Sequence, residues 1–99
     1  MLHINKQPEG SSLTIALAGR LDKTTAQVLE KGLKESLDGV TALTIDLAEL
    51  EYISSAGLRV LLSAQKTMNG QGSMVIRNAS EAVKEIFEVT GFSDILTVE

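Results

Sequence analysis

Two adjacent serines, Ser54 and Ser55, are the residues of this sequence best placed for chemistry. They precede a segment with helical periodicity, so they fall where a helix should begin. The first turn of a helix has free backbone N–H groups and a positive dipole end, and both would stabilise a phosphate on a serine there. Serine is also a preferred helix cap, and capping is its commoner role. The pair therefore indicates a cap, a phosphorylation switch, or both.

Groups that could support enzymatic catalysis are scarce. His3 is the only histidine and lies at the chain end, which argues against a Ser-His-acid triad. Ile53 stands where a nucleophile elbow, Gly-x-Ser-x-Gly, would have its first glycine. The glycines of residues 69–72 are not followed by a lysine, so they do not form a phosphate-binding loop. We expect no catalytic residues and a protein that is not an enzyme.

Metal and cofactor sites are not expected either. The sequence has no cysteine, which excludes disulfides and thiolate ligands. Three acidic residues lie close together without a histidine pair or a second acidic cluster to complete a metal shell. We interpret them as solvated carboxylates of a loop: Asp46, Glu49 and Glu51.

Composition limits the other classes of function. The 99 residues, 43% hydrophobic and 22% charged, suit one globular domain spanning residues 1–99. A net charge of -4 without a Lys/Arg cluster argues against nucleic acid as a partner. The sequence has no apolar run long enough to span a bilayer, and His3 and Asn5 stand where a signal peptide would be apolar. We therefore expect a cytoplasmic protein that does not insert into the membrane.

Periodicity predicts the elements that position the serines. Alternating apolar residues predict a hairpin over residues 2–7 and 12–18, and a short apolar run predicts a buried strand over 43–47, followed by a loop. Helical spacing predicts a first helix with Asp22 or Thr24 as its cap. The remaining predicted elements are a second helix over 55–68, a strand over 73–77, a third helix over 80–90 and a last strand over 95–98. This order predicts an α/β fold, a mostly parallel sheet with one antiparallel edge and right-handed crossovers.

The second helix offers a candidate docking face. Its inward face is predicted to consist of Leu58, Leu61, Leu62 and Gln65. The step of about 100° per residue then turns another set outward, next to Ser55. These residues form a small apolar patch with one arginine, which is also compatible with an ordinary exposed helix face: Ala56, Arg59, Val60 and Ser63.

Several segments together resemble the STAS family, the anti-sigma factor antagonists of partner-switching systems. Residues 19–22 read Gly-Arg-Leu-Asp, similar to the family's Gly-x-Leu-Asp element. Asp46-Leu47, Tyr52 and residues 54–58 are similar to its Asp-Leu strand end, aromatic residue and Asp-Ser-[Ser/Thr]-Gly-Leu motif. The Thr-Gly-Phe of residues 90–92 is similar to the end of its third helix.

The resemblance implies a single STAS-type α/β domain, with a mixed sheet flanked by helices, and a regulatory cycle. An unphosphorylated STAS antagonist binds an anti-sigma factor serine kinase of histidine-kinase-like ATPase fold and releases the kinase's target. Phosphorylation of one serine abolishes binding, and a serine phosphatase resets the switch. Register from Gly57-Leu58 puts this serine at Ser55, with Ser54 as the second choice in the place usually held by aspartate.

The resemblance also implies a partner surface around the serines. Asp22 matches the family residue in the loop that contributes to this surface, and a role as helix cap is equally compatible with its position. The expected partner-binding residues are Asp22, Ser54, Ala56, Gly57, Arg59, Val60 and Ser63. Two other classes of function stay open: a soluble STAS accessory subunit of a membrane lipid or anion transporter, and a small serine hydrolase.

Overall fold

A sheet of four strands forms the centre of the molecule, and its spatial order follows the chain, β1-β2-β3-β4. The computed structural model describes residues 2–99. The elements are β1 (Leu2–Glu9), β2 (Ser12–Leu21), α1 (Lys23–Ser36), β3 (Ala42–Ile53), α2 (Ser55–Asn69), β4 (Ser73–Arg77), α3 (Glu81–Thr90) and a 3-10 helix (Phe92–Asp94).

The strand pairing confirms the mixed sheet predicted from the sequence. β1 and β2 form an antiparallel hairpin, while β2 with β3 and β3 with β4 are parallel. Gly10, in the hairpin turn, has a φ of 61°, a conformation that glycine adopts without steric cost. The ends of β2 and β3 meet at one edge of the sheet, where Leu21 is in register with Ile53, whereas β4 ends beside Asp46 of β3.

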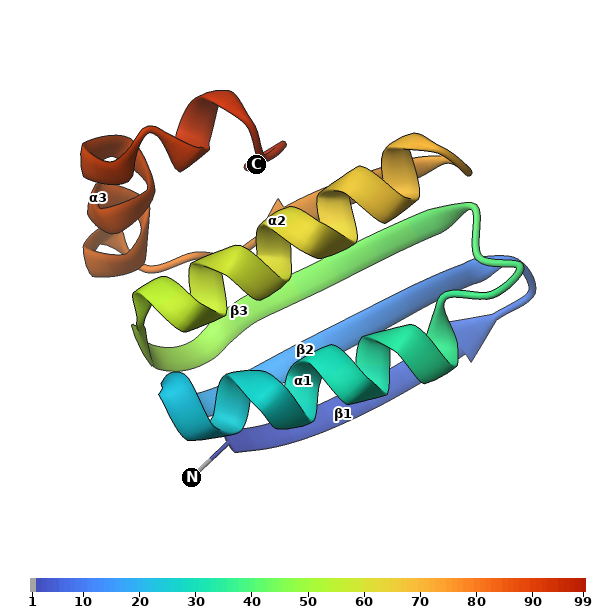
Figure 1. The fold of residues 1–99 in the computed structure, drawn as a ribbon, viewed down its shortest axis with the longest axis horizontal. Coiled ribbons are helices and arrows are strands. Elements are labelled where there is room, and N and C mark those ends of the chain that lie inside the picture. The colour runs from blue at the N-terminus through green and yellow to red at the C-terminus, as the bar shows by residue number, and fades with distance from the viewer. Residues whose placement is uncertain (1) are drawn as a thin grey trace.

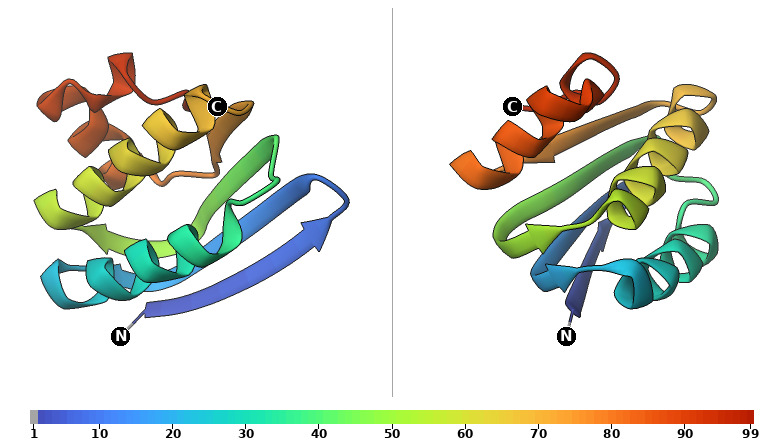
Figure 2. Two further views of the ribbon diagram at one scale, coloured as in Figure 1. Left: turned by 45° about the vertical axis from the view of Figure 1, so that its right-hand side comes forward. Right: turned by 60° about the vertical axis from the view of Figure 1, so that its left-hand side comes forward.

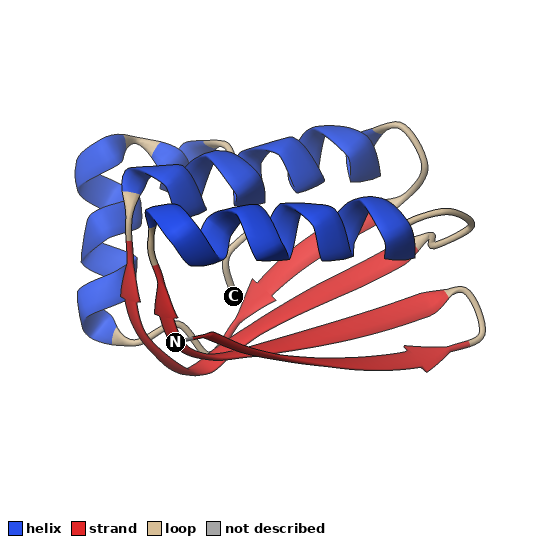
Figure 3. Cartoon of the chain, turned by 60° about the horizontal axis from the view of Figure 1, so that its bottom comes forward, coloured by secondary structure: helices blue, strands red, loops and turns tan. Residues whose placement is uncertain are grey.

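The first two helices lie side by side on one face of the sheet (Figures 1 and 3), and both views in Figure 2 show them on this face. Helix α3 lies crosswise to them, near the start of α2 (Figure 1). Leucine and isoleucine side chains of β2 and β3 meet the apolar sides of α1 and α2, which buries one continuous core. Its fully buried members include Ile15, Leu17, Leu21, Leu29, Leu43, Ile45, Leu47, Leu61, Met68, Met74, Ile76 and Phe87.

Strand β3 is much longer than predicted, so the loop expected after Leu47 is wrong. The strand continues to Ile53, and Glu49 and Glu51 lie on it and not in a loop. Its register against β2 shifts twice, between Ala16 and Ala18 and between Gly19 and Arg20. Such β-bulges insert an extra residue into one strand and interrupt the apolar alternation. For this reason the second half of β3 does not resemble a strand in sequence.

The predicted last strand over residues 95–98 is also wrong. The chain forms the 3-10 helix and then touches β4 at a single parallel bridge between Ile76 and Val98. Backbone N–H groups of Ile95 and Leu96 donate to the carbonyl of Phe92, at 3.0 and 2.8 Å, so this segment is wound into a turn. It becomes extended only where it meets the outer edge of β4.

Candidate functional site

The starts of α1 and α2 lie next to each other at the carboxyl edge of the sheet. Leu21, the last residue of β2, is in register with Ile53, the last residue of β3. The backbone N–H of Ser54 donates to the carbonyl of Leu21 at 2.8 Å, which ties the two strand ends together. The residue after each strand, Asp22 in one case and Ser54 in the other, is the N-cap of the helix that follows.

The two serines have different environments at the start of α2. Ser54 is half-buried, and its hydroxyl oxygen accepts from the backbone N–H of Gly57 at 3.3 Å. This confirms the capping role that the sequence indicated. Ser55 is the first helical residue and is exposed, and its hydroxyl makes no hydrogen bond to any of residues 2–99. The hydroxyl of Ser55 is therefore the accessible one of the pair.

Gly57 is buried beneath the start of α2 and serves the packing of this helix. A Cβ atom at this position would lie 2.7 Å from Leu21 Cγ and 3.0 Å from Ile53 Cγ1. Both neighbours are core side chains at the strand ends, so they have little room to move. Glycine lets the first turn of α2 pack directly on the sheet, and in this way it fixes the position of Ser55.

The predicted outward face of α2 is only partly correct. Arg59 and Ser63 are exposed and Ala56 is half-buried, but Val60 is 5% exposed, so its outward orientation was wrong. Helix α1 packs beside α2, and Val60 lies on the side of α2 that faces α1. Leu62, predicted to point inward, is only half-buried. The buried side of α2 is thus rotated toward α1 relative to the prediction.

Asp22 holds the start of α1 through a capping box. Its Oδ1 atom accepts from the backbone N–H groups of Thr24 and Thr25 at 3.0 and 2.9 Å, and from the Thr25 hydroxyl at 3.1 Å. The Asp22 N–H donates back to the Thr25 hydroxyl oxygen at 2.8 Å. The hydrogen bond from the Thr25 backbone N–H is the main reason why the pKa of the Asp22 carboxyl is lowered from its ordinary value. Within residues 2–99 its Oδ2 atom accepts no hydrogen bond.

A hollow of about 450 Å³ lies between the starts of α1 and α2. Both serines line it, with Lys23, Gln27 and Glu30 from α1 and Ala56, Arg59 and Val60 from α2. The hollow brings together most of the predicted partner residues on α2. Asp22 lies just before Lys23, between the end of β2 and the start of α1. Lys23 was not predicted as a site residue. Its place directly after the predicted cap was the one available signal.

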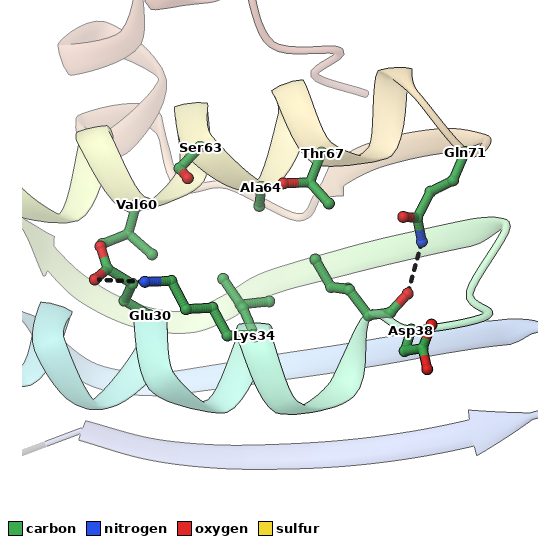
Figure 4. A pocket seen from close by; sticks show the side chains of 10 residues that line it. Glu30, Lys34, Asp38, Val60, Ser63, Ala64, Thr67 and Gln71 are labelled. Atoms are coloured by element: carbon green, nitrogen blue, oxygen red, sulfur yellow. Dashed lines mark hydrogen bonds and ion pairs between the residues drawn. The ribbon is translucent and has the colours of Figure 1, made fainter.

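The hollow continues into a second one, of about 310 Å³, along the contact between α1 and α2. Glu30 and Val60 line both hollows. Figure 4 shows Lys34 beside Glu30, with Nζ 3.7 Å from Oε1, and Gln71 reaching from the end of α2 toward α1. The Gln71 side-chain N–H group donates to the carbonyl of Leu37 at 2.6 Å. The two helices therefore form a shallow groove that begins at Ser55 and is closed at its far end by Gln71.

Two exposed residues near the caps lie outside both hollows. Arg20 and Tyr52 face each other across β2 and β3, and the Arg20 guanidinium carbon lies 4.4 Å from the centre of the Tyr52 ring. Tyr52 is 39% exposed. Their positions just before the two caps were visible in the sequence, but the contact between them depends on the bulged register of β3.

The described residues offer no evident metal centre and no membrane span. Among residues 2–99, no three His, Cys, Asp or Glu side chains gather in a way that could hold a metal ion. No helix of this part of the chain is long and apolar enough to cross a bilayer.

The fold and the site define a class of small α/β domain. In this class two helices begin side by side at the edge of the sheet where the parallel strands end. Residues 4–97 match the family described as "Mlab, STAS domain". The match spans nearly the whole chain, so this protein belongs to the STAS domain family.

Curated relatives of similar length cover most of the chain. A Bordetella bronchiseptica protein described as the anti-sigma factor antagonist BtrV is 40% identical over 88 residues, which is 87% of this chain and 76% of the relative. The anti-sigma-B factor antagonist of Listeria monocytogenes is 32% identical and is covered to 84%, with 95% of this chain matched. That of Bacillus subtilis is 28% identical, with 98% of this chain and 90% of the relative covered.

Solved structures share the fold. An anti-sigma factor antagonist from Mycobacterium paratuberculosis superposes with a TM-score of 0.89 at 20% identity, covering 99% of this chain and 85% of that one. The antagonist SpoIIAA in its unphosphorylated form gives a TM-score of 0.85 at 17% identity, covering 98% of this chain and 88% of that one. These matches confirm the predicted single α/β domain of STAS type.

Proposed function

We propose that this chain is an anti-sigma factor antagonist that acts by partner switching. In its unphosphorylated form it binds an anti-sigma factor serine kinase of histidine-kinase-like ATPase fold, which then releases its target. The kinase phosphorylates Ser55, binding is lost, and a serine phosphatase restores the first state. In this proposal the chain is a regulatory binding protein and substrate, not an enzyme, and it acts in the cytoplasm, where the kinase has ATP. Curated relatives that carry the name of anti-sigma factor antagonist support this role.

The observation that carries the choice of residue is the free, exposed hydroxyl of Ser55. A kinase must place the γ-phosphate of ATP in line with the hydroxyl oxygen that attacks it, so the acceptor has to be accessible. Ser54 is less suitable because it is half-buried and its oxygen caps α2 through the N–H of Gly57. We therefore assign the modification to Ser55 and capping to Ser54.

The partner surface of the proposal surrounds this residue. It comprises the free carboxylate oxygen of Asp22, the exposed side chains of Arg59 and Ser63, and the half-buried Ala56. Ser54, Gly57 and Val60 contribute from below, because two of them are buried and the third is half-buried. We expect substitutions at the exposed residues to change binding directly, whereas changes at the buried ones act through the shape of the surface.

The test is intact mass after incubation with the candidate kinase and ATP, followed by peptide mapping. We expect one added phosphate on the wild type and none on Ser55→Ala. Ser54→Asn is the matched control, because asparagine keeps a strong cap but has no hydroxyl to modify. Phosphate on Ser55→Ala but not on Ser54→Asn would reverse the assignment. An unmodified wild type would contradict the proposed cycle.

Co-purification distinguishes this role from that of an accessory subunit of a membrane lipid or anion transporter. Capture of the chain with a histidine-kinase-like ATPase supports the switch, while capture with a transporter ATPase supports the accessory role. In the second case Ser55 would be a contact residue and not a switch, so Ser55→Ala would leave the complex intact. Ester hydrolysis by the purified chain would instead favour the hydrolase.

A further inference from the structure

Two cationic side chains on different helices line the hollow that contains Ser55. Lys23 is the first residue of α1, and Arg59 lies four residues after Ser55 on α2. Both are exposed. Within residues 2–99 the salt bridges join Glu30 to Lys34 and Arg77 to Glu99, so neither Lys23 nor Arg59 has an acidic partner there.

Helix geometry and strand register bring both cations to the hollow that Ser55 lines. Residues i and i+4 of a helix are neighbours on one face, with Cβ atoms about 5–6 Å apart, which brings Arg59 next to Ser55. Lys23 comes from the neighbouring helix, because the register of Leu21 with Ile53 sets the start of α1 beside the start of α2. A group attached to Ser55 would therefore share the hollow with a guanidinium and an ammonium group.

The other lining residues leave this part of the hollow cationic. Among the described residues, Glu30 is the one carboxylate that lines it, and its Oε1 atom lies 3.7 Å from Nζ of Lys34. Lys34 offsets part of the Glu30 charge. Gln27 and Ser54, the remaining polar residues apart from Ser55, are neutral. The hollow is thus lined by two cations without an acidic partner among residues 2–99, by the neutral exposed hydroxyl of Ser55, and by one carboxylate, Glu30, that is paired with Lys34.

We propose that Lys23 and Arg59 together bind the phosphate group of phosphorylated Ser55, so that the modification links α1 to α2. The inference rests on the proposed function only in taking Ser55 as the modified residue. A phosphoserine carries about -1.5 to -2 charges at neutral pH and has three acceptor oxygens. The planar Arg59 guanidinium can donate to two of these oxygens, and the Lys23 ammonium supplies a point charge. Phosphorylation would then consume the two cations that the unmodified surface presents to a partner.

The experiment titrates the phosphate by phosphorus NMR at low ionic strength, in full-length protein with phosphoserine incorporated at position 55 during translation. Cations beside a phosphate favour its doubly charged form, so its second pKa in the wild type should lie below the ordinary value of about 6. We expect Lys23→Gln and Arg59→Gln each to raise this pKa by about 0.3 or more. Lys66→Gln, which removes an exposed lysine of the last turn of α2, is the control and should leave it unchanged.

Backbone amide spectra provide a second measurement. Phosphorylation should shift the amide signals at the start of α1, although Ser55 belongs to α2, and Lys23→Gln should reduce this shift. Identical phosphate titration in the wild type and in both single variants would overturn the proposal. A change in one variant alone would overturn the link between the helices. Because no kinase is used, a kinase that fails to modify Ser55 would contradict the proposed function and leave this result standing.

Discussion

The adjacent N-termini of α1 and α2 are capped in different ways. At α1 the Asp22 carboxylate accepts two backbone N–H groups, at 3.0 and 2.9 Å, and a complete capping box surrounds it. At α2 the neutral hydroxyl of Ser54 accepts one N–H group, at 3.3 Å. One helix start therefore contains its own negative charge, and the other contains none.

This difference assigns different roles to two similar positions. A helix N-terminus attracts negative charge through its dipole and its free N–H groups. Asp22 already satisfies this attraction at α1, because its carboxylate accepts two of the free N–H groups there. At α2 the attraction is unsatisfied, and the exposed Ser55 hydroxyl lies next to it. The structure thus favours α1 as a fixed support and α2 as the helix that can receive charge.

The largest expected effect comes from adding a negative charge at the N-terminus of α2, where the cap is neutral. We expect phosphorylation of Ser55 to weaken binding of the partner kinase by more than about a hundredfold, because a packed interface must desolvate the new charge, at a cost of about 3 kcal/mol. The fold should change little, since the start of α2 accommodates an anion. Titration calorimetry gives the affinity, and thermal unfolding and amide spectra of both forms report on the fold.

Ser55→Asp should reproduce only part of the loss, because it carries one charge and reaches less far. A large drop in melting temperature on phosphorylation, or amide shifts throughout the sheet, would mean that the switch is conformational. In that case the contrast between the two helix starts would not explain it.

The next effect concerns the close packing that positions α2. Gly57→Ala should reduce the free energy of unfolding by about 1–3 kcal/mol, because the new methyl group would lie 2.7 Å from Leu21 Cγ and overpack the core. Gly32→Ala is the matched control. There the added Cβ would be 3.5 Å from Lys6 Nζ, an ordinary contact, and alanine in a helix interior stabilises by about 0.5–1 kcal/mol. Urea unfolding of both variants measures the difference, and equal effects would contradict the packing role of Gly57.

Local patterns were enough to predict the elements whose signals lie within a short stretch of sequence. Strand β4 has the predicted bounds, and Asp22 is the one of the two candidate caps, Asp22 and Thr24, that caps the first helix. The short apolar run over residues 43–47 likewise predicted the first half of β3, where Leu43, Ile45 and Leu47 are buried. Each of these features depends on residues that are close in the chain.

Features that depend on distant residues were missed. After Leu47 the buried positions of β3 are Leu50 and Ile53, spaced by three because of the bulges against β2, so the alternation is lost. The burial of Val60 depends on the neighbouring α1, which a helical wheel of α2 alone does not include. Lys23 joined the site for the same reason, because its proximity to Ser55 arises from the pairing of two strand ends.

A smaller effect should separate the charge of the α1 cap from its hydrogen bonds. The pKa of Asp22 is lowered in the folded protein, chiefly by the Thr25 N–H. Its ionised form therefore contributes stability above the unfolded pKa, near 3.8, and this contribution is lost as pH falls through the lower folded value.

Asp22→Asn keeps a cap without the charge. We expect the wild type to be the more stable protein at pH 7, and the difference to shrink below about pH 4. Urea midpoints from pH 7 to pH 2 measure it, and a difference independent of pH would mean that the charge has no role.

The smallest effect is expected from giving α2 the kind of cap that α1 has. Ser54→Asp places a carboxylate at the start of α2, where the dipole and the Gly57 N–H favour it, and should stabilise the protein by about 0.3–1 kcal/mol at low salt. Because this charge is partly exposed, the gain should shrink as salt is added.

The new carboxylate would also compete with a phosphate on Ser55 for the same positive end. The phosphorylated form should therefore gain less from the substitution than the unmodified form, or lose stability. Thermal unfolding of the four proteins, with and without the phosphate and the substitution, measures this coupling as a double-mutant cycle. Equal stabilisation of both forms would show that the two anions do not share one site, and that the start of α2 has no unfilled position for the phosphate to occupy.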